Sequence, residues 1–280
     1  HLGSLMAFFA GNRTPIIFDM HGDIVSEARL NSGIFSRNFL KSVAIDKFTK
    51  MNASAVLSVS HNAKVDAENS VFLKETPVYR IPNGVDLDRY SPSVRPDEML
   101  RQQIRNSCRP IFGYIGGFQK FQGTNEFINA AKSISTDTAS FLFVGQSKNT
   151  TSENVLFYDT VPEERVAGCY AMCDVLVLPR PSIRATEVAA PTKFTEYTAM
   201  GKPILTTDVG EAGQLVKEYD CGVVVKNSDP KNITEGIKKM VRVENKELRR
   251  WGENARKLAQ NEFDWTVIGE HLNSTLYDVR

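Results

Sequence analysis

The residues best suited to chemistry lie in one segment, Ala190-Pro-Thr-Lys-Phe-Thr-Glu-Tyr-Thr-Ala-Met-Gly-Lys-Pro-Ile-Leu205. Pro191 suits the first position of a helix, where no intrahelical acceptor awaits the N–H that proline lacks. Gly201 is typical of the residue that follows a helix, and the apolar run after Pro203 is typical of a strand. The segment therefore predicts a helix over about 191–200, followed by a strand.

The start of this helix predicts an anion site. The N–H groups of Thr192 and Lys193 have no partner within the helix and lie at the positive end of its dipole, which suits a phosphate. Glu196 lies four residues after Thr192 and hence on the same face. An ionised carboxylate there can accept hydrogen bonds from both hydroxyls of a ribose. One face of the helix is thus suited to the phosphate and the sugar of a nucleoside diphosphate.

Short apolar strands alternate with helical patterns along the chain, which predicts an α/β fold with parallel sheets. After a connection at 82–92, strands are predicted near 110–116, 139–145, 154–159, 175–179, 203–207 and 221–225, and helices near 124–134, 163–173, 191–200 and 211–219. Two more helices follow Asp229 and Asn245. The part before the connection has fewer elements: strands near 15–20, 55–60 and 78–81, and a helix near 37–51.

The motifs resemble those of a known family. Pro191-x-Lys193-x-x-Glu196-Tyr197-x-x-x-Gly201-Lys202-Pro203 is similar to the nucleotide-sugar signature of the retaining glycosyltransferases of family 4, which have the GT-B fold. Further similar segments are Ile81-Pro-Asn-Gly-Val-Asp86, Tyr114-Ile-Gly-Gly, Phe141-Leu-Phe-Val-Gly145, Val161-Pro-Glu-Glu-Arg165 and Cys173-Asp-Val-Leu-Val-Leu-Pro179. The resemblance runs from about Pro15 to the C-terminus and is most specific from Phe112 to Asn227.

This resemblance implies two Rossmann-like domains of GT-B type. A partial, acceptor-side domain is expected over 1–92, a nucleotide-sugar-binding domain over 93–262, and a helix that crosses back to the first domain over 263–280. The glycine-rich strand and loop with which family members begin are not found before Pro15, so the N-terminal sheet is expected to be incomplete. Unpaired sheet edges attract another chain, which makes a homo-oligomer or a partner chain an expected way to complete the sheet.

The glycine loop Gly113–Gly123 departs from the family. Many relatives carry an arginine at the position of Gly117 and a lysine at that of Gln122, and both contact the donor phosphates. Other donors are therefore needed for a diphosphate: the backbone amides of Gly116 and Gly117, together with Lys120 and Lys193. The alternative for Lys120 is a solvated loop lysine.

The segment Arg180–Ala190 lies between a strand end and the signature helix, where ligands of open α/β sheets collect. The family places a first glutamate eight positions before the second, but position 188 here is Val, and Glu187 is one residue away. Glu187 either approaches the sugar or is a surface carboxylate. Arg184 either meets a phosphate or an acidic sugar, such as a uronic acid, or is a solvated loop charge.

His21 lies in Phe18-Asp-Met-His-Gly-Asp23, at the end of a predicted strand. It resembles the pocket histidine that many relatives place beside the donor sugar, and the alternative is a histidine that caps the turn at Gly22. Asp19 or Asp23 is suited to cap the helix that follows. His61 is interpreted as a residue at the start of a helix.

Composition limits the function classes. The chain has 280 residues and a net charge of +1, with no basic block of the kind that binds nucleic acid. Its four cysteines lack the paired spacing of a disulfide framework, and no apolar run approaches the ~20 residues that cross a bilayer. A cytoplasmic location is therefore predicted, with contact to the cytoplasmic membrane face as the family's usual setting. No cofactor and no obligatory metal are expected, since no aspartate pair stands at a strand end of the donor domain.

The resemblance implies a retaining glycosyltransferase that moves a sugar from a nucleoside diphosphate to an acceptor hydroxyl, in polysaccharide or glycan assembly. The predicted site assigns catalytic roles to His21 and Glu187 and donor binding to Gly116, Gly117, Lys120, Arg184, Thr192, Lys193 and Glu196. UDP and GDP fit the signature equally well. The alternative is a nucleotide-binding or assembly protein without catalysis. A nicotinamide dehydrogenase ranks third, because no G-x-G-x-x-G opens a helix here.

Overall fold

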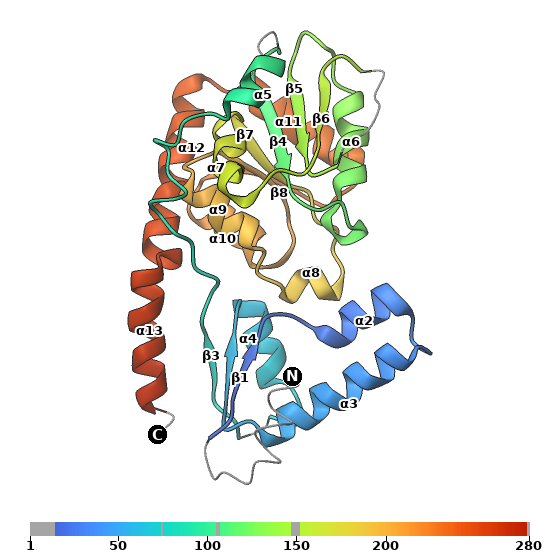
Figure 1. Cartoon of the computed structure of the whole chain (residues 1–280), viewed down its shortest axis with the longest axis vertical. Helices are drawn as coiled ribbons and strands as arrows, with labels where there is room; N and C mark the ends of the chain where they lie inside the picture. Colours follow the sequence, from blue (N-terminus) through green and yellow to red (C-terminus); the bar gives the residue numbers. More distant parts are fainter. Residues whose placement is uncertain (1–14, 74, 105–106, 147–151, 279–280) are drawn as a thin grey trace. The chain divides into compact units, whose positions relative to one another are not determined.

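The computed structural model describes residues 15–73, 75–104, 107–146 and 152–278 (Figure 1). These residues form two compact units. The first comprises the chain up to Asn83, the segment Ile183–Ala190 and the residues from Thr266 onward, and the second comprises Gly84–Ser182 and Pro191–Trp265. The segment 183–190, which the sequence places beside the signature helix, thus belongs to the first unit.

The second unit is built on a six-stranded sheet in which every pair of neighbours is parallel. Its strands are β4 (Ile111–Ile115), β5 (Ser140–Val144), β6 (Val155–Tyr158), β7 (Val175–Leu178), β8 (Ile204–Thr207) and β9 (Gly222–Val225). The apolar, largely β-branched and aromatic runs of β4, β5 and β7 are buried along their whole length, as in parallel strands covered on both faces. The six predicted strands are confirmed.

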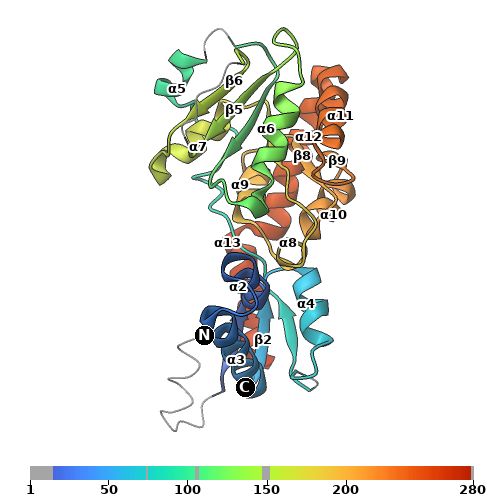
Figure 2. The same cartoon turned by 90° about the vertical axis from the view of Figure 1, so that its right-hand side faces the viewer.

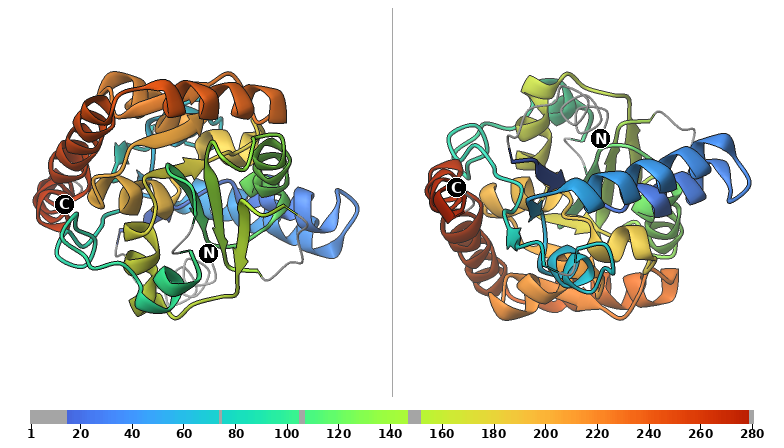
Figure 3. Two further views of the ribbon diagram at one scale, coloured as in Figure 1. Left: turned by 90° about the horizontal axis from the view of Figure 1, so that it is seen from above. Right: turned by 90° about the horizontal axis from the view of Figure 1, so that it is seen from below.

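Helices cover both faces of this sheet (Figures 2 and 3). They are α5 (Glu98–Gln103), η1 (Lys120–Gln122), α6 (Thr124–Lys132), α7 (Glu163–Ala171), α9 (Thr192–Ala199), α10 (Gly210–Glu218), α11 (Pro230–Arg242), α12 (Asn245–Leu258) and the π-helix η2 (Ala259–Phe263). Because side chains alternate along a strand, Phe112 and Tyr114 join the core under α6 and α11, whereas Ile111 and Ile115 join the core under α7, α9 and α10.

The strand order β6-β5-β4-β7-β8-β9 reverses direction between β4 and β7. The chain proceeds from β4 outward to β5 and β6, then returns to the other side of β4 and proceeds through β7 and β8 to β9. The loops that follow β4 and β7 therefore leave the sheet side by side and diverge. In open α/β sheets, ligands bind at this reversal, beyond the carboxyl ends of the strands.

The first unit has a three-stranded parallel sheet, β1 (Ile17–Met20), β2 (Ala55–Ser58) and β3 (Val78–Arg80), in the order β1-β2-β3. Its helices are α2 (Ile24–Ser32), α3 (Arg37–Asn52), α4 (His61–Glu68), α8 (Arg184–Val188) and, from its second residue, α13 (Trp265–Asp278). Helices α2 and α3 lie side by side as a hairpin (Figure 1). A small core includes Phe18, Val56 and Val78 from the strands and Val188 from α8.

Several local predictions are decided by this structure. The carboxylate of Asp23 accepts hydrogen bonds from the N–H groups of Val25 (3.1 Å) and Ser26 (3.0 Å), which confirms it as the cap of α2. His61 is the first residue of α4, as predicted. The prediction of Pro191 as the first helical residue is wrong by one position, because its extended ψ of 124° makes it the N-cap of α9.

Helix α8 lies within segment 180–190, for which the sequence pattern indicates a loop. Its five residues are too short to show a helical apolar period, and an isolated helix of this length is unstable in water. Tertiary contacts hold it instead: Val188 enters the core of the first unit, and its carbonyl accepts a hydrogen bond from Ser60 Oγ at 2.7 Å. Neighbouring side chains of the same unit therefore determine this helix.

Candidate functional site

The loop after β4 is shaped by glycines at the point where the strand order reverses. Gly116 has φ 137° and Gly123 has φ 70°, conformations that side-chain-bearing residues rarely adopt. A Cβ atom at Gly123 would lie 1.8 Å from the carbonyl oxygen of Pro179, so the loop packs directly against the end of β7. The Tyr114 hydroxyl donates a hydrogen bond to the Gly117 carbonyl at 2.6 Å and fixes the first turn of the loop.

Lys193, in the first turn of α9, lies across the first glycine of this loop. A Cβ atom at Gly116 would lie 2.1 Å from Lys193 Cε and 2.7 Å from its Nζ, so only glycine leaves room for the lysine. The ammonium also lies over the Tyr114 ring, 5.7 Å from its centroid. Burial lowers the pKa of Lys193, and the nearby Glu196 carboxylate opposes that shift. The glycine loop and the start of α9 thus meet at a largely desolvated cation.

Glu196 lies one turn further along α9 and is held by two phenol groups. Tyr170 donates its hydroxyl to Glu196 Oε2 at 2.5 Å, and Tyr90 also hydrogen-bonds the carboxylate. Burial raises the pKa of Glu196, while the hydrogen bonds from Tyr170 and Tyr90 and the charge of Lys193 lower it. The result is a half-buried, oriented carboxylate next to a cation.

Sequence reasoning missed both tyrosines. The Tyr170 ring packs edge-on against Tyr197, with centroids 5.1 Å apart, and lies 6.1 Å from the ring of Tyr90. Burial raises the pKa of Tyr90 to about 12, so it is a hydrogen-bond donor at neutral pH. A buried tyrosine usually finds a partner for its hydroxyl. Applied to Tyr170 on the apolar face of α7, this rule indicates from the sequence that its hydroxyl bonds a polar group nearby.

Arg180 was also missed. It lies two residues after the end of β7 and is 7% exposed, and its carbonyl accepts a hydrogen bond from Thr207 Oγ1 at 2.6 Å. The positive charge of Arg180 contributes to lowering the pKa of Lys193. The same charge acts to lower the pKa of the Tyr114 phenol, against the effect of burial. The position of Arg180, two residues after a strand at the reversal point, was a signal in the sequence that this charge lies at the same edge of the sheet.

Among the predicted donor-binding residues, five lie together at this edge: Gly116, Gly117, Thr192, Lys193 and Glu196. Thr192 is the exposed first residue of α9, next to Lys193. Lys120 opens the short helix η1 within the glycine loop and is exposed. The loop, the end of β7 and the start of α9 therefore form one candidate anion-binding site in the second unit.

The other predicted site residues belong to the first unit. The exposed His21 pairs with Asp19 (Nε2 to Oδ2, 2.8 Å). The Arg184 guanidinium contacts Asp23 at 2.7 Å and Asp66 at 2.8 Å, beside a cavity of about 250 Å³. The Glu187 carbonyl accepts a hydrogen bond from Asn62. Arg184 therefore already has two carboxylate partners, and neither Glu187 nor Arg184 groups with the second unit.

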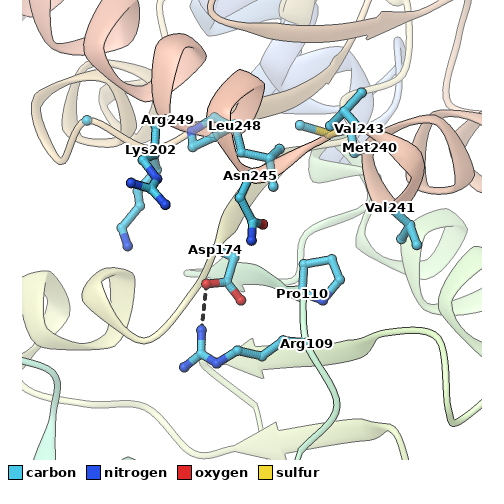
Figure 4. A pocket seen from close by; sticks show the side chains of 12 residues that line it. Arg109, Pro110, Asp174, Lys202, Met240, Val241, Val243, Asn245, Leu248 and Arg249 are labelled. Atoms are coloured by element: carbon cyan, nitrogen blue, oxygen red, sulfur yellow. Dashed lines mark hydrogen bonds and ion pairs between the residues drawn. The ribbon is translucent and has the colours of Figure 1, made fainter.

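A larger cavity, of about 580 Å³, lies at the opposite edge of the six-stranded sheet (Figure 4). Its lining includes Arg109 and Pro110, which precede β4, Asp174, which precedes β7, and Pro203, which precedes β8. Arg109 and Asp174 form an ion pair within it. Because the strands are parallel, this cavity lies at their amino ends and is separate from the candidate anion-binding site.

Within the described ranges, no three His, Cys, Asp or Glu side chains cluster in a way that suits a metal ion. None of the helices in the described part of the chain is both long and apolar enough to span a bilayer.

Comparison with known proteins decides the family. The family model described as glycosyl transferases group 1 matches residues 97–258, more than half of the chain. The chain belongs to this family. The match includes the glycine loop, Arg180, Lys193 and Glu196.

One similar relative is the capsular polysaccharide biosynthesis glycosyltransferase CapM of Staphylococcus aureus, which is 24% identical over 259 residues. The alignment covers 82% of this chain and 63% of CapM, so the chain spans less than two thirds of that relative.

Two solved structures have a similar fold. Sucrose-phosphate synthase from Thermosynechococcus elongatus matches 98% of this chain and 70% of its own, with a TM-score of 0.77 and 19% identity. Anabaena HepE, in complex with UDP and glucose, matches 99% of this chain and 74% of its own, with a TM-score of 0.76 and 19% identity. The predicted α/β fold of GT-B type is confirmed.

Proposed function

We propose that this chain is a retaining glycosyltransferase that transfers a sugar from a nucleoside diphosphate to an acceptor hydroxyl, in polysaccharide or glycan assembly. The observation that carries the proposal is the placement of Lys193 and Glu196 one turn apart on α9, with Lys193 lying across Gly116 where the strand order reverses. A cation and an oriented carboxylate one turn apart match the phosphate and ribose of one nucleotide. The family, the name of CapM and the ligands of HepE support this choice.

Each donor-site residue has a role in this proposal. The amides of Gly116 and Gly117, the start of α9 at Thr192 and the ammonium of Lys193 bind the diphosphate, and Lys120 extends this cationic edge. Glu196 accepts hydrogen bonds from the ribose hydroxyls. The phenols of Tyr90 and Tyr170 orient it through its existing hydrogen bonds.

The chemistry proposed is substitution at the anomeric carbon with retention of configuration. The acceptor oxygen forms a bond to that carbon while the bond to the diphosphate oxygen breaks, and the acceptor's proton passes to the departing diphosphate. Cations and helix N–H groups placed where negative charge develops lower the barrier to such a step. His21 and Glu187 of the first unit are proposed to contact the sugar or the acceptor, and Arg184 to contact the donor once it exchanges its present carboxylate partners.

The proposal extends to the protein's surroundings. The acceptor is a glycan or a lipid-linked glycan, the location is the cytoplasm or the cytoplasmic face of the membrane, and no cofactor, metal or nucleic acid takes part. A second copy or a partner chain beside the three-stranded sheet of the first unit is part of the same proposal. If the protein is monomeric by light scattering and still transfers sugar, the part of the proposal that requires a partner chain is wrong.

Isothermal titration of UDP, GDP and ADP tests the donor site. We expect one of the three to bind and Glu196→Ala to weaken it at least about 10-fold, since hydrogen bonds to a charged group contribute about 1.5–3 kcal/mol. Glu253→Ala, which removes an exposed carboxylate from α12, is the matched control and is expected to bind as the parent does. Binding of none of the three, or equal binding by Glu196→Ala, contradicts the proposal.

The alternative is a nucleotide-binding or assembly protein without catalysis. The observation that favours it is the glycine loop, in which Gly117 and Gln122 replace the phosphate-binding cations of many relatives. Incubation with UDP-glucose and GDP-mannose separates the two functions. Release of free diphosphate with a sugar acceptor supports the enzyme, and tight nucleotide binding without release supports the alternative.

A further inference from the structure

The diphosphate of the proposed donor needs more positive charge than the glycine loop supplies. A nucleoside diphosphate carries at least two negative charges, and the loop itself has one lysine, the exposed Lys120. Lys193 contributes a second charge from α9. The position after β7 therefore becomes important, because its loop leaves the sheet beside the glycine loop.

Arg180 lies in that loop, two residues after the end of β7. A Cβ atom at Gly123 would lie 3.5 Å from Arg180 Cα, so Arg180 adjoins the last glycine of the loop. Lys193 lies across Gly116, the first glycine after β4. Segments that carry the two cations thus contact the two ends of the loop, at the carboxyl edge of β4 and β7.

We propose that Arg180 binds the donor diphosphate together with Lys193. The two residues would thus replace the cations that many family members carry at the positions of Gly117 and Gln122. This inference rests on the proposed function and adds a binding residue to it. An arginine fork matches the paired oxygens of a phosphate, whereas a lysine acts as a point charge.

The electrostatics of the site support this role. Arg180 and Lys193 repel each other, and burial together with this repulsion lowers the pKa of Lys193. Two like charges at a largely desolvated position destabilise the empty site, and a bound dianion removes that cost. Glu196 offsets part of the repulsion, but it also carries the proposed ribose contacts.

The backbone at Arg180 is anchored independently of its guanidinium. The anchor is the hydrogen bond from Thr207 Oγ1 to the Arg180 carbonyl, which a side-chain substitution leaves in place. Arg180→Gln and Arg180→Lys are therefore expected to keep the end of β7 where it is. Thermal unfolding of both variants checks this before any titration.

The test compares ligands that differ only in phosphates: uridine, UMP and UDP, with guanosine, GMP and GDP in parallel. In the parent protein we expect affinity to rise from monophosphate to diphosphate. We expect Arg180→Gln to reduce that rise by about 10- to 100-fold, Arg180→Lys to reduce it less, and both to bind the nucleoside as the parent does. Arg249→Gln, an exposed arginine at the opposite cavity, is the control and keeps the full rise.

The outcomes separate the two levels of the proposal. If the parent binds diphosphate and both Arg180 variants keep its diphosphate-to-monophosphate ratio, Arg180 has no role in phosphate binding and the inference is overturned alone. If the parent binds no nucleotide, the proposed function fails and the inference fails with it. If Arg180→Gln does not fold, the ratio measured with Arg180→Lys decides in the same way.

Discussion

Glu196 combines burial, which disfavours its charge, with four neighbours that favour it: Tyr170, Tyr90, Lys193 and Arg89. Burial is the largest influence and leaves its pKa above the ordinary value. A carboxylic acid with a raised pKa binds its proton at a higher pH than an ordinary glutamate and then loses acceptor capacity. The pH at which Glu196 ionises therefore limits ribose binding from the acid side.

Between neutral pH and the ordinary glutamate pKa of about 4.3, we expect nucleoside diphosphate affinity to decline more steeply with falling pH in the parent protein than in Glu196→Gln, because the pKa of Glu196 is raised. The two proteins share the titration of the phosphates, so the ratio of their affinities isolates the carboxylate. Titration at four pH values in this range is the measurement. A ratio that stays constant over the range contradicts a role for ionised Glu196.

Tyr170 controls the same titration through its hydroxyl. Its hydrogen bond lowers the pKa of Glu196, so Tyr170→Phe should raise that pKa further and shift the affinity decline to higher pH. The loss of a hydrogen bond to a charged group should also reduce the unfolding free energy by about 1.5–3 kcal/mol. Tyr219→Phe, at the end of α10, is the control and should leave the pH profile unchanged. A merely structural Tyr170 would lower stability without moving the profile.

Among the elements, the loop between β4 and α6 depends most strongly on the identity of single residues. Gly116→Ala places a methyl group where Lys193 Cε lies and strains a backbone at φ 137°. We expect diphosphate affinity to fall at least about 10-fold and stability to fall by about 1–3 kcal/mol. Calorimetric titration and denaturant unfolding measure the two effects. Unchanged binding by Gly116→Ala would show that the position of Lys193 is unimportant.

Gly269→Ala is the matched control for that substitution. Gly269 lies inside α13, and a Cβ atom there meets nothing within 4 Å. Alanine is favoured over glycine in a helix interior by about 0.8–1 kcal/mol. We therefore expect this variant to be more stable than the parent and to bind nucleotide equally, which separates the effect of a methyl group in general from its effect at Gly116.

The elements that the sequence predicted well are those with their own local signal. Strand β5 (Ser140–Val144) is a continuous apolar run after its first residue, and the end of α9 is marked by Gly201, which has φ 61°. Helix α8 has no such signal, because contacts of Val188 and Thr186 within the first unit determine it. The sequence pattern therefore predicts the sheet of the second unit. It fails for short elements whose conformation depends on contacts with other parts of the chain.

The candidate site divides in the same way. Glu196 was predictable because its spacing from Thr192 fixes their common helix face, and Lys193 was predictable because it lies in the first turn of the same helix. Tyr90, Tyr170 and Arg180 reach the site from three other segments of the chain, and their proximity depends on the strand order β4-β7 and on the packing of α7 against the sheet. Contacts made by tertiary packing leave no spacing pattern in the sequence.

At the scale of the whole chain, the apolar cores follow the division into units. Both large core clusters, which run from Val85 to Phe263, contain only residues of the second unit. The small cluster that includes Phe18, Val56 and Val188 contains only residues of the first. Every residue assigned here to the nucleotide, from Gly116 to Glu196 apart from Arg184, lies in the second unit. Folding of that unit and nucleotide binding should therefore be separable from the rest of the chain.

We expect a fragment of residues 84–265 to fold cooperatively and to bind the same nucleoside diphosphate within a few-fold of the full chain, because both of its cores and the entire anion-binding edge are retained. It should transfer no sugar, since His21 is absent. Circular dichroism during heating and calorimetric titration measure the first two properties, and release of diphosphate measures the third. Replacing segment 183–190 by a short glycine-serine linker in this fragment tests whether α8, which belongs to the first unit, affects nucleotide binding. A folded fragment that has lost its affinity for the nucleotide would mean that the first unit supplies part of the donor site. Arg184 and Glu187 would then be the candidates for direct contact with the donor.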